Sequence, residues 1–346
     1  MVFNVTILDS ITHFNKNQWN SLVEQTKLGT VFHKYEWLKA IEEGIGLEPR
    51  HIVVRKGENP VGIFPNFISK IRKTPFKIMT SAGPSYGGPI ITTKDERQIL
   101  DLIFNSVSKI FGVTVIWHRI RTHNLENVKY EHHFEKKGYN SNIQSCDFVI
   151  NLNKGEENIK SEMRKFRRRN LTRILERDHY IKDENINEKT LNDFYKSYRK
   201  VIEKVQGHLL PFSFFISMMK NLANRMKIFS AYVDEINIGK TLLLLDKEKQ
   251  LIYSFLSGIE KSSFEYYPYE LTHWHSIKWG MENGYKKYVL GATSADFTDG
   301  RFKFKEEFGG EIIPILSWEK HNFLYNIGIF LMRNLHISYN LFPHPE

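Results

Sequence analysis

The residues with the clearest chemical potential form a short basic and aromatic run near the end of the chain. Lys305 stands among Phe302, Phe304 and Phe308, and two glycines follow. An ammonium group flanked by aromatic rings is partly withdrawn from water. Such a group can stabilise negative charge that develops on a carbonyl oxygen, or it can exchange protons if its pKa falls. The alternative is an ordinary surface lysine on an amphipathic turn.

An ordered set of elements leads up to this run. Residues 271–284 carry apolar side chains at helical spacing and end in Asn-Gly, which favours a helix stop. Residues 287–290 predict a buried strand that continues into Gly291 and Thr293, small residues that let a ligand or another backbone approach. Asp296 lies in the following loop and can orient an amine, although a turn or cap role fits equally well. We therefore expect Gly291, Thr293 and Asp296 to contact substrate.

Positive charge is concentrated in residues 158–177, which hold eight basic and two acidic residues, +6 of the chain total of +10. If this segment is one helix, Arg167 falls on its apolar face. We expect Arg167 to point into a cleft between two domains and to bind a phosphate or carboxylate in a bidentate manner. The alternative is a solvated helix whose arginines extend past an apolar stripe.

Composition sets the broad class. The 346 residues are 41% hydrophobic and 25% charged, which predicts two globular domains, and the net charge of +10 favours an anionic partner. The single Cys146 argues against disulfides, and no signal segment or membrane span is recognisable, so we expect a cytoplasmic protein. His273 and His275 point to different sides of a helix, so no metal site is expected.

The order helix, glycine, strand occurs twice along the chain. Gly112 and Gly284 are 172 residues apart, and Gly138 and Gly309, which close two later boxes, are 171 apart. This agreement indicates a tandem duplication rather than chance similarity of two α/β units. Three successive strands over 227–256, followed by helix, strand and helix, favour an α+β fold. We predict domains at 1–155 and 156–346. The tail, 321–342, is expected to pack on the second domain, with a peripheral membrane contact as the alternative.

Several boxes together resemble the FemAB-type branch of the GNAT superfamily, which contains tandem-domain peptidyl and acyl transferases. The first box is residues 81–89, which include Tyr86, Gly87 and Gly88; the second is Lys165-Phe166-Arg167; the third is residues 304–310. The resemblance covers about residues 30–314. It implies two tandem GNAT-like domains, each with a mixed, mostly antiparallel sheet flanked by helices. It also implies that Tyr86, Gly87 and Gly88 bind substrate.

The resemblance implies transfer of an acyl or aminoacyl group to an amine of a cell-envelope or glycan precursor, either small or lipid-linked. Phe304 and Lys305 match the pair that lies at the reacting ester in Fem ligases, and Tyr253 is a weaker candidate for the acceptor site. The donor is expected to be aminoacyl-tRNA, with acyl-CoA as the alternative. We expect no tightly bound cofactor and no DNA partner. The chain departs from the pattern by lacking a CoA pyrophosphate loop between Phe255 and Leu271 and by having Thr92-Thr93 where Fem ligases have Asp. A competing hypothesis is a non-catalytic RNA-binding module.

Overall fold

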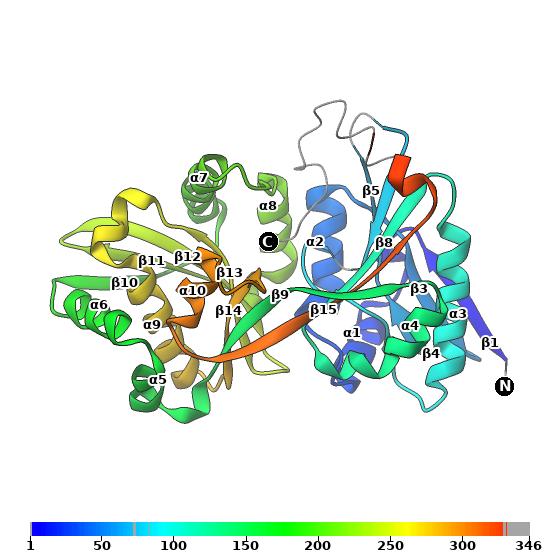
Figure 1. Cartoon of the computed structure of the whole chain (residues 1–346), viewed down its shortest axis with the longest axis horizontal. Helices are drawn as coiled ribbons and strands as arrows, with labels where there is room; N and C mark the ends of the chain where they lie inside the picture. Colours follow the sequence, from blue (N-terminus) through cyan, green and yellow to red (C-terminus); the bar gives the residue numbers. More distant parts are fainter. Residues whose placement is uncertain (1, 72–73, 82, 328–329, 331–346) are drawn as a thin grey trace. The chain divides into compact units, whose positions relative to one another are not determined.

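The computed structural model describes residues 2–71, 74–81, 83–327 and 330. The chain forms two compact units: unit 1 comprises residues 1–144 and 315–346, and unit 2 comprises residues 145–314 (Figure 1). Most of the expected tail, 321–342, lies outside the described residues. Among the helices of the described part, none is both long enough and apolar enough to cross a membrane.

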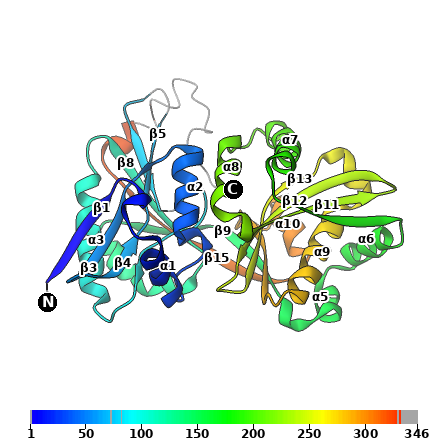
Figure 2. The same cartoon turned by 180° about the vertical axis from the view of Figure 1, so that it is seen from behind.

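Unit 1 contains two sheets with helices packed on them. Its described elements are β1 (Phe3–Leu8), α1 (Lys16–Gln25), α2 (Tyr35–Ile45), β2 (Glu48–Pro49), β3 (His51–Lys56), β4 (Asn59–Phe64), β5 (Phe67–Lys70), β6 (Lys77–Thr80), β7 (Ile90–Ile91), α3 (Glu96–Ile110), β8 (Val115–Thr122) and α4 (Glu131–Lys136). One sheet has the order β1-β3-β4-β7, and in the other β8, β6, β5 and β2 are neighbours in that order. Figure 2 shows α1 against β4. The core forms because α3 buries Ile99, Ile103 and Val107 on one face, at helical spacing.

Unit 2 is built on one mixed sheet. Its described elements are α5 (Glu156–Glu162), α6 (Lys165–Leu175), β10 (His179–Glu184), α7 (Glu188–Lys204), α8 (Phe212–Leu222), β11 (Met226–Val233), β12 (Ile236–Asp246), β13 (Leu251–Gly258), α9 (Pro268–Glu282), β14 (Lys287–Ser294) and α10 (Gly300–Glu306). The strand order is β10-β11-β12-β13-β14, and β14 then pairs with β9 (Asn140–Asn151). The helix α9 buries Leu271, Trp274 and Ile277 against this sheet. The α+β prediction with helix-flanked mixed sheets is confirmed.

The two units repeat the same order of elements. The series α3, β8, α4, β9 corresponds to α9, β14, α10 and β15 (Glu311–His321), and β6–β8 and β13–β14 are both parallel pairs. The last strands are exchanged. The strand β9 follows α4 but pairs with β14, and β15 follows α10 but pairs with β8. Each unit is therefore completed by a strand from the other half of the sequence.

This exchange accounts for a difference from the predicted domain limits of 1–155 and 156–346. Residues 315–346 belong to unit 1, because Leu316 to His321 pair with β8. The basic segment also differs from the single helix expected over 158–177. It forms α5 and α6 with a break at Met163 and Arg164, whose backbones are extended. Two apolar residues of this segment, Phe166 and Leu175, are exposed, 39% and 37%.

Candidate functional site

The candidate site in unit 2 lies where two parallel strands separate. The strands β13 and β14 pair over only three positions, from Leu251 opposite Lys287 to Tyr253 opposite Val289. Beyond these positions both strands continue without pairing with each other. The register of β14 against β9 also shifts between Val289 and Ala292, at Gly291, whose φ is +87°. A bulge at this point turns backbone carbonyls away from the regular ladder.

The side chain of Lys305 is hydrogen-bonded to the backbone at this bulge. Its Nζ donates to the carbonyl oxygens of Gly291 at 2.8 Å and Ala292 at 2.7 Å. A Cβ at Gly291 would lie 3.2 Å from the carbonyl oxygen of Ser254 and 3.6 Å from Lys305 Nζ. The glycine is therefore required both by its positive φ and by the close approach of β13. The structure brings Lys305 and Gly291 together and holds the ammonium of Lys305 at the point where the strands part.

Arg167 lies between two carboxylates of its own unit. Its Nη1 donates to Glu270 Oε1 at 2.6 Å, and its Nη2 donates to Glu307 Oε2 at 3.0 Å. Asn170 Nδ2 donates to the same Glu270 oxygen at 3.2 Å. The guanidinium carbon is 4.3 Å from the ring centroid of Phe304, a cation–π contact. Arg167 therefore binds the carboxylates of Glu270 and Glu307. The sequence analysis instead expected it to bind the phosphate or carboxylate of a ligand.

The linker box and the final box meet in unit 2. Arg164 N donates to the carbonyl oxygen of Glu307 at 2.9 Å, and Arg164 Nη2 donates to Glu306 at 2.9 Å. A Cβ at Gly310, where φ is +99°, would lie 2.9 Å from the carbonyl oxygen of Val149. These contacts join α6, α10 and β9. They fix the backbone on the C-terminal side of Lys305.

Aromatic rings pack against Phe304, and His273 lies beside two of these rings. The ring of Tyr269 packs edge-on against Phe304 with centroids 5.1 Å apart, and Phe308 does so at 5.2 Å. His273 Nδ1 is 2.7 Å from the hydroxyl of Tyr288. Burial, with the nearby charges of Lys305 and Arg167, lowers the pKa of His273 to about 3. His273 is therefore neutral at physiological pH.

The other predicted residues of unit 2 occupy different environments. Tyr253 is buried on β13 at the last position that pairs with β14. Thr293 is buried opposite Cys146, and its hydroxyl has no hydrogen-bond partner within the described part of the chain. Asp296 is exposed and accepts hydrogen bonds from Thr298 N at 2.8 Å and Thr298 Oγ1 at 2.7 Å, which lower its pKa. This is the turn role that the sequence left open for Asp296.

Tyr86, Gly87 and Gly88 belong to unit 1. The Tyr86 ring is buried, with His123 at 4.3 Å and Phe32 at 5.4 Å between ring centroids. Gly87 N donates to the carbonyl oxygen of Arg121 at 2.7 Å, and Gly88 N donates to Ser81 Oγ at 2.8 Å. A Cβ at Gly87 would lie 2.3 Å from Ser81 Oγ, so only glycine fits. The box is a tightly bonded loop beside β8.

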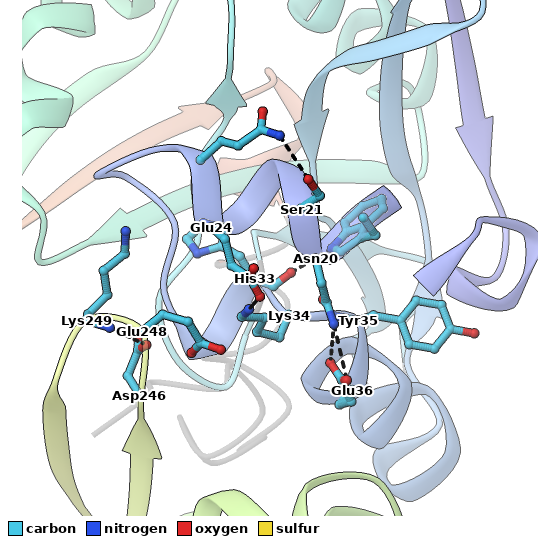
Figure 3. A network of polar contacts seen from close by, with 12 residues as sticks. Asn20, Ser21, Glu24, His33, Lys34, Tyr35, Glu36, Asp246, Glu248 and Lys249 are labelled. Atoms are coloured by element: carbon cyan, nitrogen blue, oxygen red, sulfur yellow. Dashed lines mark hydrogen bonds and ion pairs between the residues drawn. The ribbon is translucent and has the colours of Figure 1, made fainter. Parts of the chain in front are cut away.

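Polar contacts hold the segment that carries Phe32 (Figure 3). Asn20 Nδ2 donates to Glu36 Oε2 at 2.9 Å, and Asn20 Oδ1 accepts from Tyr35 N at 2.9 Å. Lys34 is buried and forms an ion pair with Glu24. These contacts join α1 to the start of α2. They support Phe32 against Tyr86 from within unit 1.

Sequence reasoning missed three residues of the candidate site. Glu270 is 4% exposed and binds Arg167, but nothing in its local pattern distinguishes it from a first-turn helix glutamate. Tyr269, whose ring packs against Phe304, also has no sequence pattern around it that indicates a role in the site. Glu307 lies in the recognised final box and could have been found as the partner of a basic residue. Within the described residues, no group of three or more His, Cys, Asp or Glu side chains could hold a metal ion.

Comparison with solved structures defines the class of fold. The crystal structure of FemX aligns with a TM-score of 0.70 at 12% identity, covering 95% of this chain and 99% of that one. A tandem GNAT protein from the clavulanic acid biosynthesis pathway aligns with a TM-score of 0.60 at 8% identity, covering 92% and 98%. L-PGS from Bacillus licheniformis aligns with a TM-score of 0.59 at 11% identity, covering 93% and 96%. The protein has the tandem GNAT fold.

A family model for FemAB-like proteins, described as peptidoglycan biosynthesis/recognition, matches residues 102–308. The chain belongs to this family, and the resemblance noted in the sequence is confirmed. No functionally curated protein matches the sequence significantly. Family membership and fold together support an acyl or aminoacyl transferase that uses a donor co-substrate.

Proposed function

We propose that this protein transfers an aminoacyl group from aminoacyl-tRNA to an amine of a peptidoglycan or other cell-envelope precursor, in the active site around Lys305. The observation that carries the proposal is the ammonium of Lys305, held by two carbonyls where β13 and β14 part. Membership in the FemAB-like family supports the reaction class and the kind of acceptor. Phe304 precedes Lys305 on α10 and packs beside the Arg167 guanidinium.

For this reaction the protein has to position the two substrates and stabilise the negative charge that develops on the carbonyl oxygen. The acceptor amine attacks the carbonyl carbon of the donor ester, a C–N bond forms, and the C–O bond to the tRNA ribose breaks. The amine loses a proton and the leaving oxygen gains one. The Lys305 ammonium stabilises the oxyanion of the tetrahedral intermediate, and the fixed bulge at Gly291 keeps the charge in place.

The aminoacyl-tRNA donor is supported by the basic surface of α6. Lys165, Arg169 and Arg173 are exposed along this helix. Arg168 is less suitable for contact with RNA, because its Nη1 donates to the carbonyl oxygens of Ser161 and Met163 at the end of α5. An acyl-CoA donor is the second candidate. The edge of β13 beyond Tyr253, which does not pair with β14, suits an extended donor that carries amide groups.

The test compares product formation by wild type and Lys305→Met, with charged tRNA and an amine-bearing envelope precursor. We expect Lys305→Met to lower kcat by about 100-fold, the loss typical of removing one group that stabilises an oxyanion. Lys305→Arg, which keeps the charge, should retain part of the activity. Lys303→Met, an exposed change on the same helix, should leave kcat unchanged.

Thermal melting separates catalysis from folding, because Lys305→Met also removes two hydrogen bonds to backbone. Assays are therefore run below the melting temperature of the variant. Wild-type turnover by Lys305→Met would overturn the assignment of the site. Turnover with acetyl-CoA but none with charged tRNA would overturn the donor and favour a CoA-dependent N-acetyltransferase. Salt-dependent RNA binding without turnover by either donor would favour a non-catalytic RNA-binding module.

A further inference from the structure

The described beginning of the tail packs on unit 1 through one side of a short helix. Residues 324–327 and 330 are helical. Figure 1 shows this helix beside β5 and β8. Leu324 and Tyr325 pack against a buried apolar cluster of unit 1, which consists of Ile71, Phe76, Ile78, Ile116 and Trp117. This part of the tail therefore packs on unit 1, whereas the sequence analysis expected the tail to pack on the second domain.

The other side of the same segment carries exposed apolar side chains. Phe323, Ile327 and Phe330 recur at helical spacing, which places them on one side. They are 79%, 49% and 65% exposed. A helix on a protein surface normally presents polar residues on its outer side. Apolar residues on both sides therefore indicate a surface that contacts a partner.

Val113 extends this apolar surface. It is 74% exposed and follows Gly112, whose carbonyl oxygen accepts a hydrogen bond from Asn322 Nδ2 at 2.9 Å. Asn322 N also donates to the carbonyl oxygen of Ile116 at 3.0 Å. Because Phe323 directly follows Asn322, these bonds hold Val113 and Phe323 on neighbouring loops. We call the following four residues the tail patch: Val113, Phe323, Ile327 and Phe330.

The sequence around the tail patch is basic. Residues 67–80, 108–117 and 321–333 contain six basic residues and no aspartate or glutamate, although the chain has 39 acidic residues among 346. Lys109 is exposed in the last turn of α3, three residues before Gly112. Positive charge thus accompanies the exposed apolar side chains.

The acidic residues on two neighbouring strands are already bonded to basic groups. Glu48 on β2 forms an ion pair with Lys77 at 3.0 Å. Glu319 on β15 lies 3.5 Å from His321, and the charge of Arg119 helps to lower its pKa. The region therefore complements a surface that is apolar inside and negatively charged outside, which describes an anionic lipid layer.

We propose that the tail patch binds an anionic membrane surface. The apolar side chains of the patch enter the boundary between head groups and acyl chains, and the surrounding basic side chains contact the lipid phosphates. The inference goes beyond the proposed transfer reaction and does not depend on it. It brings unit 1 to the membrane that carries lipid-linked envelope precursors.

The test measures co-sedimentation of the full-length protein with vesicles of phosphatidylcholine alone and of equimolar phosphatidylcholine and phosphatidylglycerol. Wild type should bind the mixed vesicles more tightly, and the affinity should fall as salt is added. Phe323→Ser should weaken binding about tenfold at every salt concentration, because one large ring no longer leaves water on binding. Lys109→Gln should weaken binding about fivefold at low salt and less at high salt, because it removes one charge.

A matched control is Phe297→Ser on unit 2. Phe297 is 74% exposed, but it lies between Asp296 and Asp299 and outside the tail patch. This variant should bind vesicles like wild type. Phe323 is also exposed, so the melting temperature of Phe323→Ser should equal that of wild type.

Three results decide the inference. Equal binding of wild type and Phe323→Ser to the mixed vesicles would overturn it, as would absence of wild-type binding. A wild-type dimer in solution that Phe323→Ser disrupts, without vesicle binding, would overturn it and assign the tail patch to a second copy of the chain. Lys305→Met should bind vesicles like wild type, so vesicle binding without any transfer activity would count against the proposed function alone.

Discussion

Lys305 and Gly291 depend on each other. The ammonium of Lys305 donates to the carbonyl oxygen of Gly291, and the positive φ of this glycine shapes the bulge that presents the carbonyl to the lysine. A glycine at φ +87° is conformationally ordinary, whereas another residue would be strained. The positive charge is therefore positioned by backbone geometry as much as by the lysine itself.

At the same scale, His273 predicts how stability depends on pH. Its pKa is about 3 in the folded protein against an ordinary value of 6.5, so the unfolded chain binds the proton more readily. Stability is then complete above about pH 6.5 and falls as the pH drops towards 3, by up to about 1.4 kcal/mol per pH unit for this group.

Urea unfolding between pH 7 and pH 5 checks this expectation. His273→Gln, which still offers a hydrogen-bonding group to Tyr288, should show a smaller loss of unfolding free energy over this range than wild type. His118, whose pKa burial also lowers to about 3, remains in both proteins and contributes equally. The same pH dependence in wild type and His273→Gln would contradict the assignment.

At the scale of elements, Arg167 joins three helices of unit 2. It lies on α6, Glu270 lies in α9, and Glu307 follows α10. The side chains of Arg167 and Glu270 are only 12% and 4% exposed, so each charge relies on the other. The role of Arg167 as a ligand for a substrate anion stays a prediction, and its contacts support a role in positioning α10.

We expect Arg167→Met to lower the unfolding free energy by about 3 kcal/mol, because Glu270 is left buried without its partner. The double variant Arg167→Met with Glu270→Gln removes both charges and should recover part of this loss. Urea unfolding of the two variants and wild type measures the difference. No recovery in the double variant would show that the ion pair does not account for the cost.

At the scale of the whole molecule, the exchange of β9 and β15 makes each unit depend on both halves of the sequence. Trp318 on β15 shows this dependence. Its ring is 1% exposed, packs edge-on against Phe134 at 4.9 Å, and donates its N–H to Glu131. All three residues belong to unit 1, although Trp318 follows the whole of unit 2 in the chain.

We expect Trp318→Ala to destabilise unit 1 by about 3–5 kcal/mol, because it leaves a large cavity in a packed core. Hydrogen exchange should become faster in β8 and remain slow in β14. Phe302→Ala is the matched control: Phe302 packs against Phe148 in unit 2, so its loss should affect β14 and spare β8. Equal changes in both strands after either substitution would contradict separate cores.

Much of the local architecture could be predicted from the sequence. The helix α9 and the three strands β11, β12 and β13 follow from apolar periodicity, and Gly138, Gly284 and Gly309 all adopt the positive φ expected after a helix. These signals occupy short windows, and the spacing of the glycines also indicates the tandem repeat. Lys305 and its aromatic neighbours in residues 302–308 could also be recognised, because they lie within one short window of the sequence.

The tertiary structure alone decided which distant groups meet. Arg167 and Glu270 are 103 positions apart, and β15 returns to β8, so no local pattern could indicate either contact. The break between α5 and α6 depends on Arg164 N bonding to the carbonyl of Glu307, which competes with continuing the helix. Periodicity determines which face of an element is apolar, but the partner of that face depends on long-range packing and on satisfying every buried polar group.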